Sequence, residues 1–326
     1  MTDAMNPPAV VAPVDLPAGV EIFPAQPRDE WLRRRQADVT ASTVGALFGA
    51  HEFVSPFGLF ALKAGLAKED VEASSPVIER GELLEPVALE LLRRRFPDLR
   101  FARGTSYYRD GARRIGATPD AFCWEADRGL GVVQIKSVEP SVFRRKWIDE
   151  QGEITPPVWV ALQAIVEARL TGARRAAVAP LRTGFVLEID LLPVELHDRH
   201  WRRVCEVVAD FWRRVEANEP YPPDYGRDGA LIARLNPIRD DAPPKDLSGD
   251  NELPALLDER AALTASAKAA KERLDAIKAE IIHKLGECST GYCADGRMIV
   301  RKIQTRKEHV VKASTFEVLN VKEARP

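Results

Sequence analysis

The chain has 326 residues, enough for one large domain and a smaller module. It is 45% hydrophobic and 29% charged, as globular proteins usually are, and its net charge of −2 excludes a uniformly basic nucleic-acid coat. Contacts to nucleic acid would therefore need local basic patches. No apolar run approaches the roughly 20 residues of a membrane helix, and four irregularly placed cysteines are typical of reduced thiols. We expect a cytoplasmic protein that does not contact the membrane.

The N-terminal segment, residues 1–27, is rich in proline and alanine and lacks the basic start and apolar block of a signal peptide. We predict that it is a disordered leader. A helix should begin near Asp29, and Thr40 or Ser42 is expected to cap a second, short helix that runs through Leu47.

Periodic apolar residues and breaks at Gly, Asp and Pro place the elements that follow. Helices before and after a compact set of strands favour an α/β domain over 28–218, with a central mixed β-sheet flanked by helices. The expected helices are 57–66, 77–96, 156–171 and 193–216; the expected strands are 99–101, 106–109, 113–117, 121–125 and 131–138; and 174–181 with 184–191 should form a hairpin of edge-type strands.

The C-terminal part of the chain, from residue 219 onward, is expected to lie outside the α/β domain. Residues 219–250 contain two proline pairs that resist regular structure, so we predict a linker. Residues 251–326 should form a small module with one long helix at 252–285 and a hairpin at 291–303. The helix carries a coiled-coil-like apolar seam. It either recruits a partner or packs on its own domain, and the sequence favours neither.

The residues that could carry out a reaction lie in the stretch that contains Asp120 and Lys136. Asp120 follows a proline at the start of an expected strand, and Gln134 and Lys136 share one face of another strand because they are two residues apart. A carboxylate, an amide oxygen, the Ile135 carbonyl and a lysine are the groups needed to hold Mg²⁺ and activate a water. Glu85, on the preceding long helix, could add a second carboxylate. Taken singly, these residues are better explained as a turn aspartate and solvated strand side chains, because short motif matches are often accidental.

The order of the motifs resembles that of the YqaJ-type viral recombinases, relatives of phage lambda exonuclease in the PD-(D/E)XK nuclease superfamily. The resemblance covers about half of the chain and implies a restriction-endonuclease-like core, a phage or prophage origin, and a bacterial host cytoplasm. The matching pieces are Trp31, Arg35 and residues 40–49, then 80–88, 116–120 and 134–137, and finally Trp159 and Gln163.

The resemblance also implies roles for individual residues. Glu85 and Asp120 would bind Mg²⁺, or Mn²⁺ in its place, Lys136 would be catalytic, and Gln163 would lie near the site. Arg35 and Ser42 would form a pocket for a DNA 5′-phosphate. The sequence departs from the family pattern at one of these positions: the family has an acidic residue where this chain has Gln134. Because an amide oxygen is a weaker ligand for a hard cation than a carboxylate, we expect weaker metal binding or a single metal.

These residues lead us to expect a Mg²⁺-dependent exodeoxyribonuclease. It would resect linear double-stranded DNA from a 5′ end for recombination by single-strand annealing, with an annealing protein as partner and, by resemblance, a trimeric assembly. Two alternatives stay open: a structure-specific endonuclease of the same superfamily, and a non-catalytic DNA-binding scaffold with a degenerate metal site. Three basic clusters, at 33–35, 93–95 and 144–146, either contact the phosphate backbone or are solvated helix faces.

Overall fold

The computed structural model describes residues 16–25, 27–68, 76–239, 241–305, 313 and 321. The chain divides into two compact units, residues 1–238 and residues 239–326.

A six-stranded mixed sheet forms the centre of the first unit. Its order is β10-β8-β7-β6-β3, and β9 pairs with β8. Only β7 and β8 run parallel among these neighbours, and each strand pairs on both sides, so both are interior strands. The strands are β3 (Arg100–Arg103), β6 (Ala121–Glu125), β7 (Gly129–Val138), β8 (Arg175–Thr183), β9 (Leu187–Ile189) and β10 (Leu192–Val194).

A second, four-stranded sheet has the order β1-β4-β5-β2. Its strands β2 and β5 pair in parallel, and the other pairs are antiparallel. The strands are β1 (Val20–Phe23), β2 (Val39–Thr40), β4 (Tyr107–Asp110) and β5 (Ile115–Ala117).

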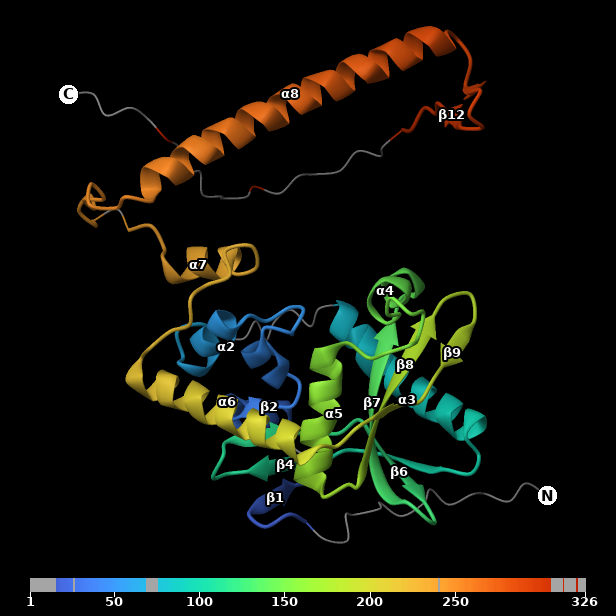
Figure 1. Cartoon of the computed structure of the whole chain (residues 1–326), viewed down its shortest axis with the longest axis vertical. Coiled ribbons are helices and arrows are strands. Elements are labelled where there is room, and N and C mark those ends of the chain that lie inside the picture. The colour runs from blue at the N-terminus through green and yellow to red at the C-terminus, as the bar shows by residue number, and fades with distance from the viewer. Residues whose placement is uncertain are drawn as a thin grey trace. The chain divides into compact units, whose positions relative to one another are not determined.

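Helix α5 connects the parallel strands β7 and β8 and packs on both of them. It also contacts η1, β4 and β5, so it lies between the central sheet and the elements of the smaller sheet (Figure 1). The helices of this unit are α1 (Arg28–Ala37), η1 (Val44–Phe48), α2 (Pro56–Lys63), α3 (Pro76–Arg95), α4 (Pro140–Lys146), α5 (Val158–Thr171), α6 (Asp198–Ala217) and α7 (Gly229–Leu235).

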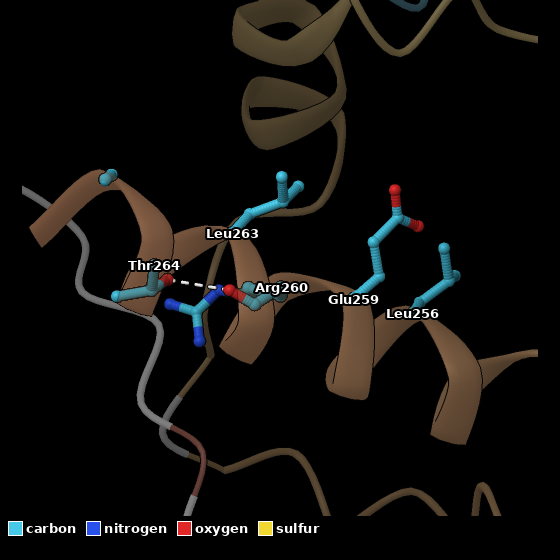
Figure 2. A pocket seen from close by; sticks show the side chains of 6 residues that line it. Leu256, Glu259, Arg260, Leu263 and Thr264 are labelled. Carbon is cyan, nitrogen blue, oxygen red and sulfur yellow. Dashed lines mark hydrogen bonds between the residues drawn. The ribbon is translucent and has the colours of Figure 1, made fainter. Parts of the chain in front are cut away.

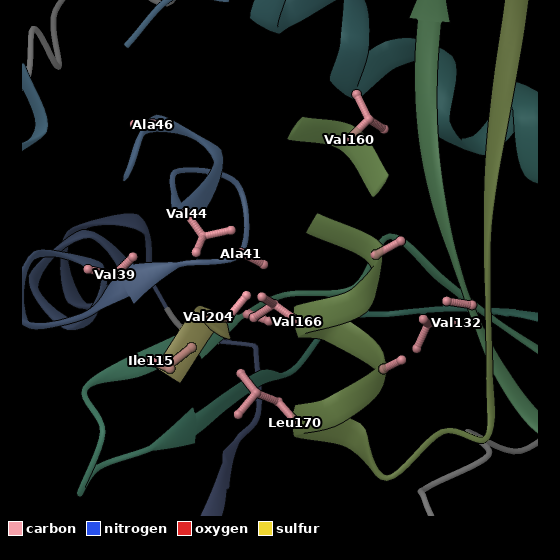
Figure 3. Close-up of a cluster of buried hydrophobic side chains, with 14 of the residues drawn as sticks. Val39, Ala41, Val44, Ala46, Ile115, Val132, Val160, Val166, Leu170 and Val204 are labelled. Atoms are coloured by element: carbon pink, nitrogen blue, oxygen red, sulfur yellow. The ribbon is translucent and has the colours of Figure 1, made fainter. Parts of the chain in front are cut away.

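The side chains of β7 alternate between two apolar clusters. Val133 and Ile135 belong to a cluster with α3, whereas Val132 belongs to the larger cluster around α5. Figure 3 shows Val166 and Leu170 of α5 pointing into this larger cluster, toward the smaller sheet. The buried side chain of Gln134 on β7 must therefore find its hydrogen-bond partners within the protein.

The structure confirms the predicted α/β class, with a mixed sheet flanked by helices. Three local predictions are wrong. Residues 20–23 of the expected disordered leader form β1, which pairs with β4, while residues 1–15 and 26 lie outside the described residues. The residue that caps η1 is Thr43, without a side-chain bond, instead of Thr40 or Ser42. Strand β8 is interior because β10, which the sequence reading missed, covers its other edge.

The predicted linker also contains ordered structure, since α7 lies within it. Just before α7, Asp228 is buried and accepts a 2.6 Å hydrogen bond from the hydroxyl of Ser55, the residue that caps α2. This contact ties the first part of the expected linker to the α/β unit. The division at 219–250 and 251–326 otherwise stays a prediction.

The second unit contains the predicted long helix and hairpin: α8 (Leu253–Leu285), β11 (Thr290–Tyr292) and β12 (Met298–Val300). No residue of α8 is buried among the described residues. A shallow hollow runs along one side of the helix, lined by Leu256, Leu263 and their neighbours, and the Thr264 hydroxyl donates to the Arg260 carbonyl beside it (Figure 2). None of the helices in the described ranges is long and apolar enough to span a bilayer.

Candidate active site

Asp120 lies immediately before β6, where the chain passes very close to the end of β3. The Gly104 amide donates a 2.9 Å hydrogen bond to the Asp120 carbonyl, and a Cβ atom at residue 104 would lie 2.0 Å from the Pro119 carbonyl oxygen. Only glycine fits there. This close approach fixes the Pro119–Asp120 segment against the sheet.

The Asp120 carboxylate points at β7 and accepts two hydrogen bonds from it. The backbone amide of Ile135 donates to Oδ2 at 2.8 Å, and the Gln134 side-chain amide donates to the same oxygen. Both bonds end on Oδ2, which leaves Oδ1 as the Asp120 oxygen available to a cation.

The hydrogen bonds continue from β7 to α5 through Gln163. Its Nε2 donates to Gln134 Oε1 at 2.8 Å, and its Oε1 accepts a 3.0 Å bond from Lys136 Nζ. The Lys136 ammonium also lies 5.2 Å from the centre of the Trp159 ring, at the start of α5. The structure thus brings Asp120, Gln134, Lys136 and Gln163 together, as their predicted roles require.

Glu85 approaches the same site from α3. Its Oε2 accepts a 3.2 Å bond from Arg103 at the end of β3, and its charge acts on Asp120. The guanidinium of Arg103 therefore holds the Glu85 carboxylate on the side of the sheet where Asp120 lies.

Arg35 and Ser42, the two residues predicted to bind a 5′-phosphate, contact each other. Arg35 Nη2 donates to Ser42 Oγ at 3.1 Å, and the Thr40 hydroxyl lies 3.0 Å from the same oxygen. The Arg35 guanidinium stacks over the ring of Trp31 at 4.3 Å, and the Trp31 indole donates to Thr118, two residues before Asp120. The Arg35–Ser42 pair is thereby linked to the Asp120 segment.

The electrostatics favour binding of a cation. Burial raises the pKa of Asp120 to about 7, although the ammonium of Lys136 opposes the rise and Glu85 adds to it. Burial likewise raises the pKa of Glu85, against the effect of Arg103. Carboxylates that resist ionisation in the absence of a cation gain most when one arrives, because the cation offsets the cost of their buried charge.

The donor set fits a single hard cation. Asp120, Glu85 and the Ile135 carbonyl offer oxygen atoms, and Mg²⁺ is usually held by few protein oxygens together with several waters. Within the described ranges, no group of three or more His, Cys, Asp or Glu side chains is spaced to hold a metal. Gln134 turns its Nε2 toward Asp120 and its oxygen toward Gln163, so it would have to rotate to become a ligand. Its role as a ligand stays a prediction.

The sequence reading missed Glu167, one turn beyond Gln163 on α5. Its side chain is fully buried, and its Oε1 accepts a 3.1 Å bond from Gln163 Nε2. Burial, followed by the negative charge of Asp120, raises its pKa well above the usual range. The signal was present: Glu167 is an acidic residue in a largely apolar helix, four residues after the polar Gln163 and therefore on the same face.

Residues 30–174 match the family model described as the YqaJ-like viral recombinase domain. This finding confirms the resemblance, and every residue of the candidate site lies inside the matched segment. No curated protein matches the chain.

Several solved structures are similar in fold to the chain. An alkaline exonuclease from Laribacter hongkongensis is 17% identical with a TM-score of 0.45, and the match covers 63% of this chain and 98% of that one. A putative exonuclease from Eubacterium rectale is 12% identical with a TM-score of 0.41, covering 69% and 98%. A SOX–DNA complex is 11% identical with a TM-score of 0.37, covering 60% and 70%. Because all three TM-scores lie below 0.5, no conclusion is drawn from these structures.

The raised pKa of Asp120 predicts how stability depends on pH without metal. Between its usual pKa and about 7, the folded protein holds a proton that the unfolded chain has released. The contribution of Asp120 to the free energy of unfolding therefore falls as pH rises through that window. In EDTA, the melting temperature should fall more between about pH 5 and about pH 8 for the wild type than for Asp120→Asn. The exposed Asp98→Asn is the control. Identical pH dependence in the wild type and Asp120→Asn would contradict the raised pKa.

Proposed function

We propose that this protein is a Mg²⁺-dependent deoxyribonuclease that resects linear double-stranded DNA from a 5′ end. The YqaJ-like domain supports a nuclease of the phage recombinase type. The observation that carries the proposal is the convergence of Asp120 and Lys136: one carboxylate oxygen is left open to a cation, and an ammonium group is held beside it by Gln163.

In hydrolysis, some residues of the site would bind the metal and others would act on the water and the phosphate. Asp120, Glu85 and the Ile135 carbonyl would hold Mg²⁺, which when bound polarises the phosphate and activates water. Lys136 orients the attacking water or stabilises the charge that develops on the phosphate. Gln163 keeps the ammonium in place.

The Arg35–Ser42 pair supports the choice of the 5′ end. A guanidinium and hydroxyl groups are suited to a terminal phosphate, which carries more charge than an internal phosphodiester. Because Trp31 connects this pair to Thr118, a phosphate bound there would be held at a fixed position relative to Asp120.

A local basic surface supports DNA binding. Helix α4 follows the carboxyl end of β7, and Figure 1 places it at the end of the sheet to which β7 and β8 point. Arg144, Arg145 and Lys146 lie exposed in its last turn. Such a cluster can neutralise backbone phosphates without reading sequence.

The finer points of the proposal concern partners and setting. We also propose, as expectations for a YqaJ-like recombinase, a single-strand annealing protein as partner, a homo-oligomeric assembly and a bacterial host cytoplasm. The second enzyme candidate, a structure-specific endonuclease, would use the same residues but would cut branched DNA without needing an end. A non-catalytic scaffold would bind duplex DNA and never cut it.

The first test is degradation of linear duplex DNA bearing a 5′-phosphate, in Mg²⁺ and in EDTA. The wild type should release acid-soluble nucleotides only with Mg²⁺, and Lys136→Ala should lose activity by about 100-fold or more, because the lysine acts on the reacting groups. Lys245→Ala, at an exposed position outside the site, should behave as the wild type. Binding without cutting by the wild type would favour the scaffold, and cutting of circular branched DNA would favour the endonuclease.

The second test concerns the 5′-phosphate. Arg35→Ala should remove the preference for a 5′-phosphorylated end over a 5′-hydroxyl end, because the guanidinium binds the terminal phosphate. The rate on the hydroxyl end should change little. Arg33→Ala is a matched control from the same helix, where Arg33 pairs at the surface with Asp29. A preference that survives in Arg35→Ala would overturn the assignment of this pocket.

A further inference from the structure

Glu167 is a buried carboxylate that the hydrolysis scheme does not use. It is 0% exposed, its Oε1 accepts from Gln163, and its Oε2 has no hydrogen-bond partner among the described residues. Burying such a group costs free energy unless its bonds are satisfied. A costly residue of this kind beside a candidate active site calls for a functional explanation.

The hydrogen-bond chemistry of Glu167 fixes the direction of the amide chain. Gln163 turns its NH₂ group toward Oε1 of Glu167, and this oxygen is an acceptor whether or not the other oxygen, Oε2, carries a proton. The carbonyl oxygen of Gln163 then necessarily faces the other way, where it accepts from Lys136. If the Gln163 amide were reversed, its NH₂ group would face an ammonium group that can only donate.

The orientation of the Gln163 amide determines that of the Gln134 amide. Gln163 Nε2 also donates to Gln134 Oε1, so Gln134 must turn its own NH₂ group away from α5 and toward Asp120. Gln134 therefore completes a chain of donors and acceptors that runs from α5 to the metal-binding carboxylate. This chain gives the amide at position 134 a use that a carboxylate at that position could not have, since it could not donate to Asp120.

We propose that Glu167 is a positioning residue: as the terminal acceptor on α5, it sets the direction of the Gln163 and Gln134 amides and so holds Lys136 and Asp120 in their working positions. In this arrangement Gln134 orients Asp120 and is not itself a metal ligand. The inference rests on the proposed nuclease function for its kinetic consequences, but the amide chain exists in the protein whatever reaction it performs.

The kinetic test replaces Glu167 with methionine, which keeps the volume and removes the acceptor. We expect kcat to fall about 10- to 100-fold, as for other groups that orient residues contacting a metal. KM for duplex DNA should stay unchanged, because Glu167 is buried away from the DNA surface. Glu167→Gln should restore most of the rate, since its side-chain oxygen still accepts from Gln163. Thr171→Val, one turn further along α5 and equally buried, is the matched control and should keep wild-type kinetics.

Stability separates this role from a merely structural one. Because Oε2 is buried without a partner, Glu167→Met should unfold at the same temperature as the wild type or at a higher one. Its kcat should nevertheless be lower than that of the wild type. Wild-type kcat in Glu167→Met would overturn the proposal. So would an equally low kcat in Glu167→Gln, which would mean that the charge matters and the acceptor does not.

A spectroscopic readout keeps the inference independent of nuclease activity. In protein labelled with ¹⁵N-glutamine, the side-chain amides of Gln134 and Gln163 should each give one set of signals protected from exchange. In Glu167→Met these signals should broaden or double, because both amide orientations become accessible. Unchanged signals would overturn the inference even if the protein is a nuclease, and a wild type that never cuts DNA would overturn only the proposed function.

Discussion

The burial of β7 on both edges and both faces is the constraint on which the candidate site depends. Gln134 on this strand is buried, so its side-chain amide must be satisfied within the protein. Gln134 meets this demand through Asp120 on one side and Gln163 on the other. The functional groups are therefore held by the same packing that forms the core, and they cannot shift without breaking buried hydrogen bonds.

The arrangement also explains how the strand tolerates an amide where the YqaJ-type family has an acid. A further buried carboxyl group, that of Glu167 on α5, is connected to Gln134 through Gln163. The buried region around Lys136 thus keeps more than one carboxylate, although only Asp120 and Glu85 lie on the side proposed for the metal. Functional sites often retain such costly groups, and the apolar packing around α5 compensates for them.

Much of this organisation was predictable from the sequence. The i, i+2 spacing of Gln134 and Lys136 placed them on one face of a strand, and the helical periodicity placed α3, α5, α6 and α8 close to their observed bounds. The interior position of β8 was not predictable, because an apolar run that begins with arginine suits an edge as well as a centre until its neighbours are known. Strand β1 was missed because its four residues gain their order only by pairing with β4, far away in sequence. Glu167 was visible as an acidic residue in an apolar helix, but its partner could be identified only from the packing of α5 on β7.

Calorimetric titration of the metal-free protein with Mg²⁺ tests the central claim most directly, because it examines the Asp120 site without requiring turnover or DNA. The account predicts saturable binding of one ion in the wild type, loss of that binding in Asp120→Asn, and tighter binding in Gln134→Glu, which adds a carboxylate beside Asp120. Absence of binding in the wild type, or binding that Asp120→Asn leaves intact, would contradict the account.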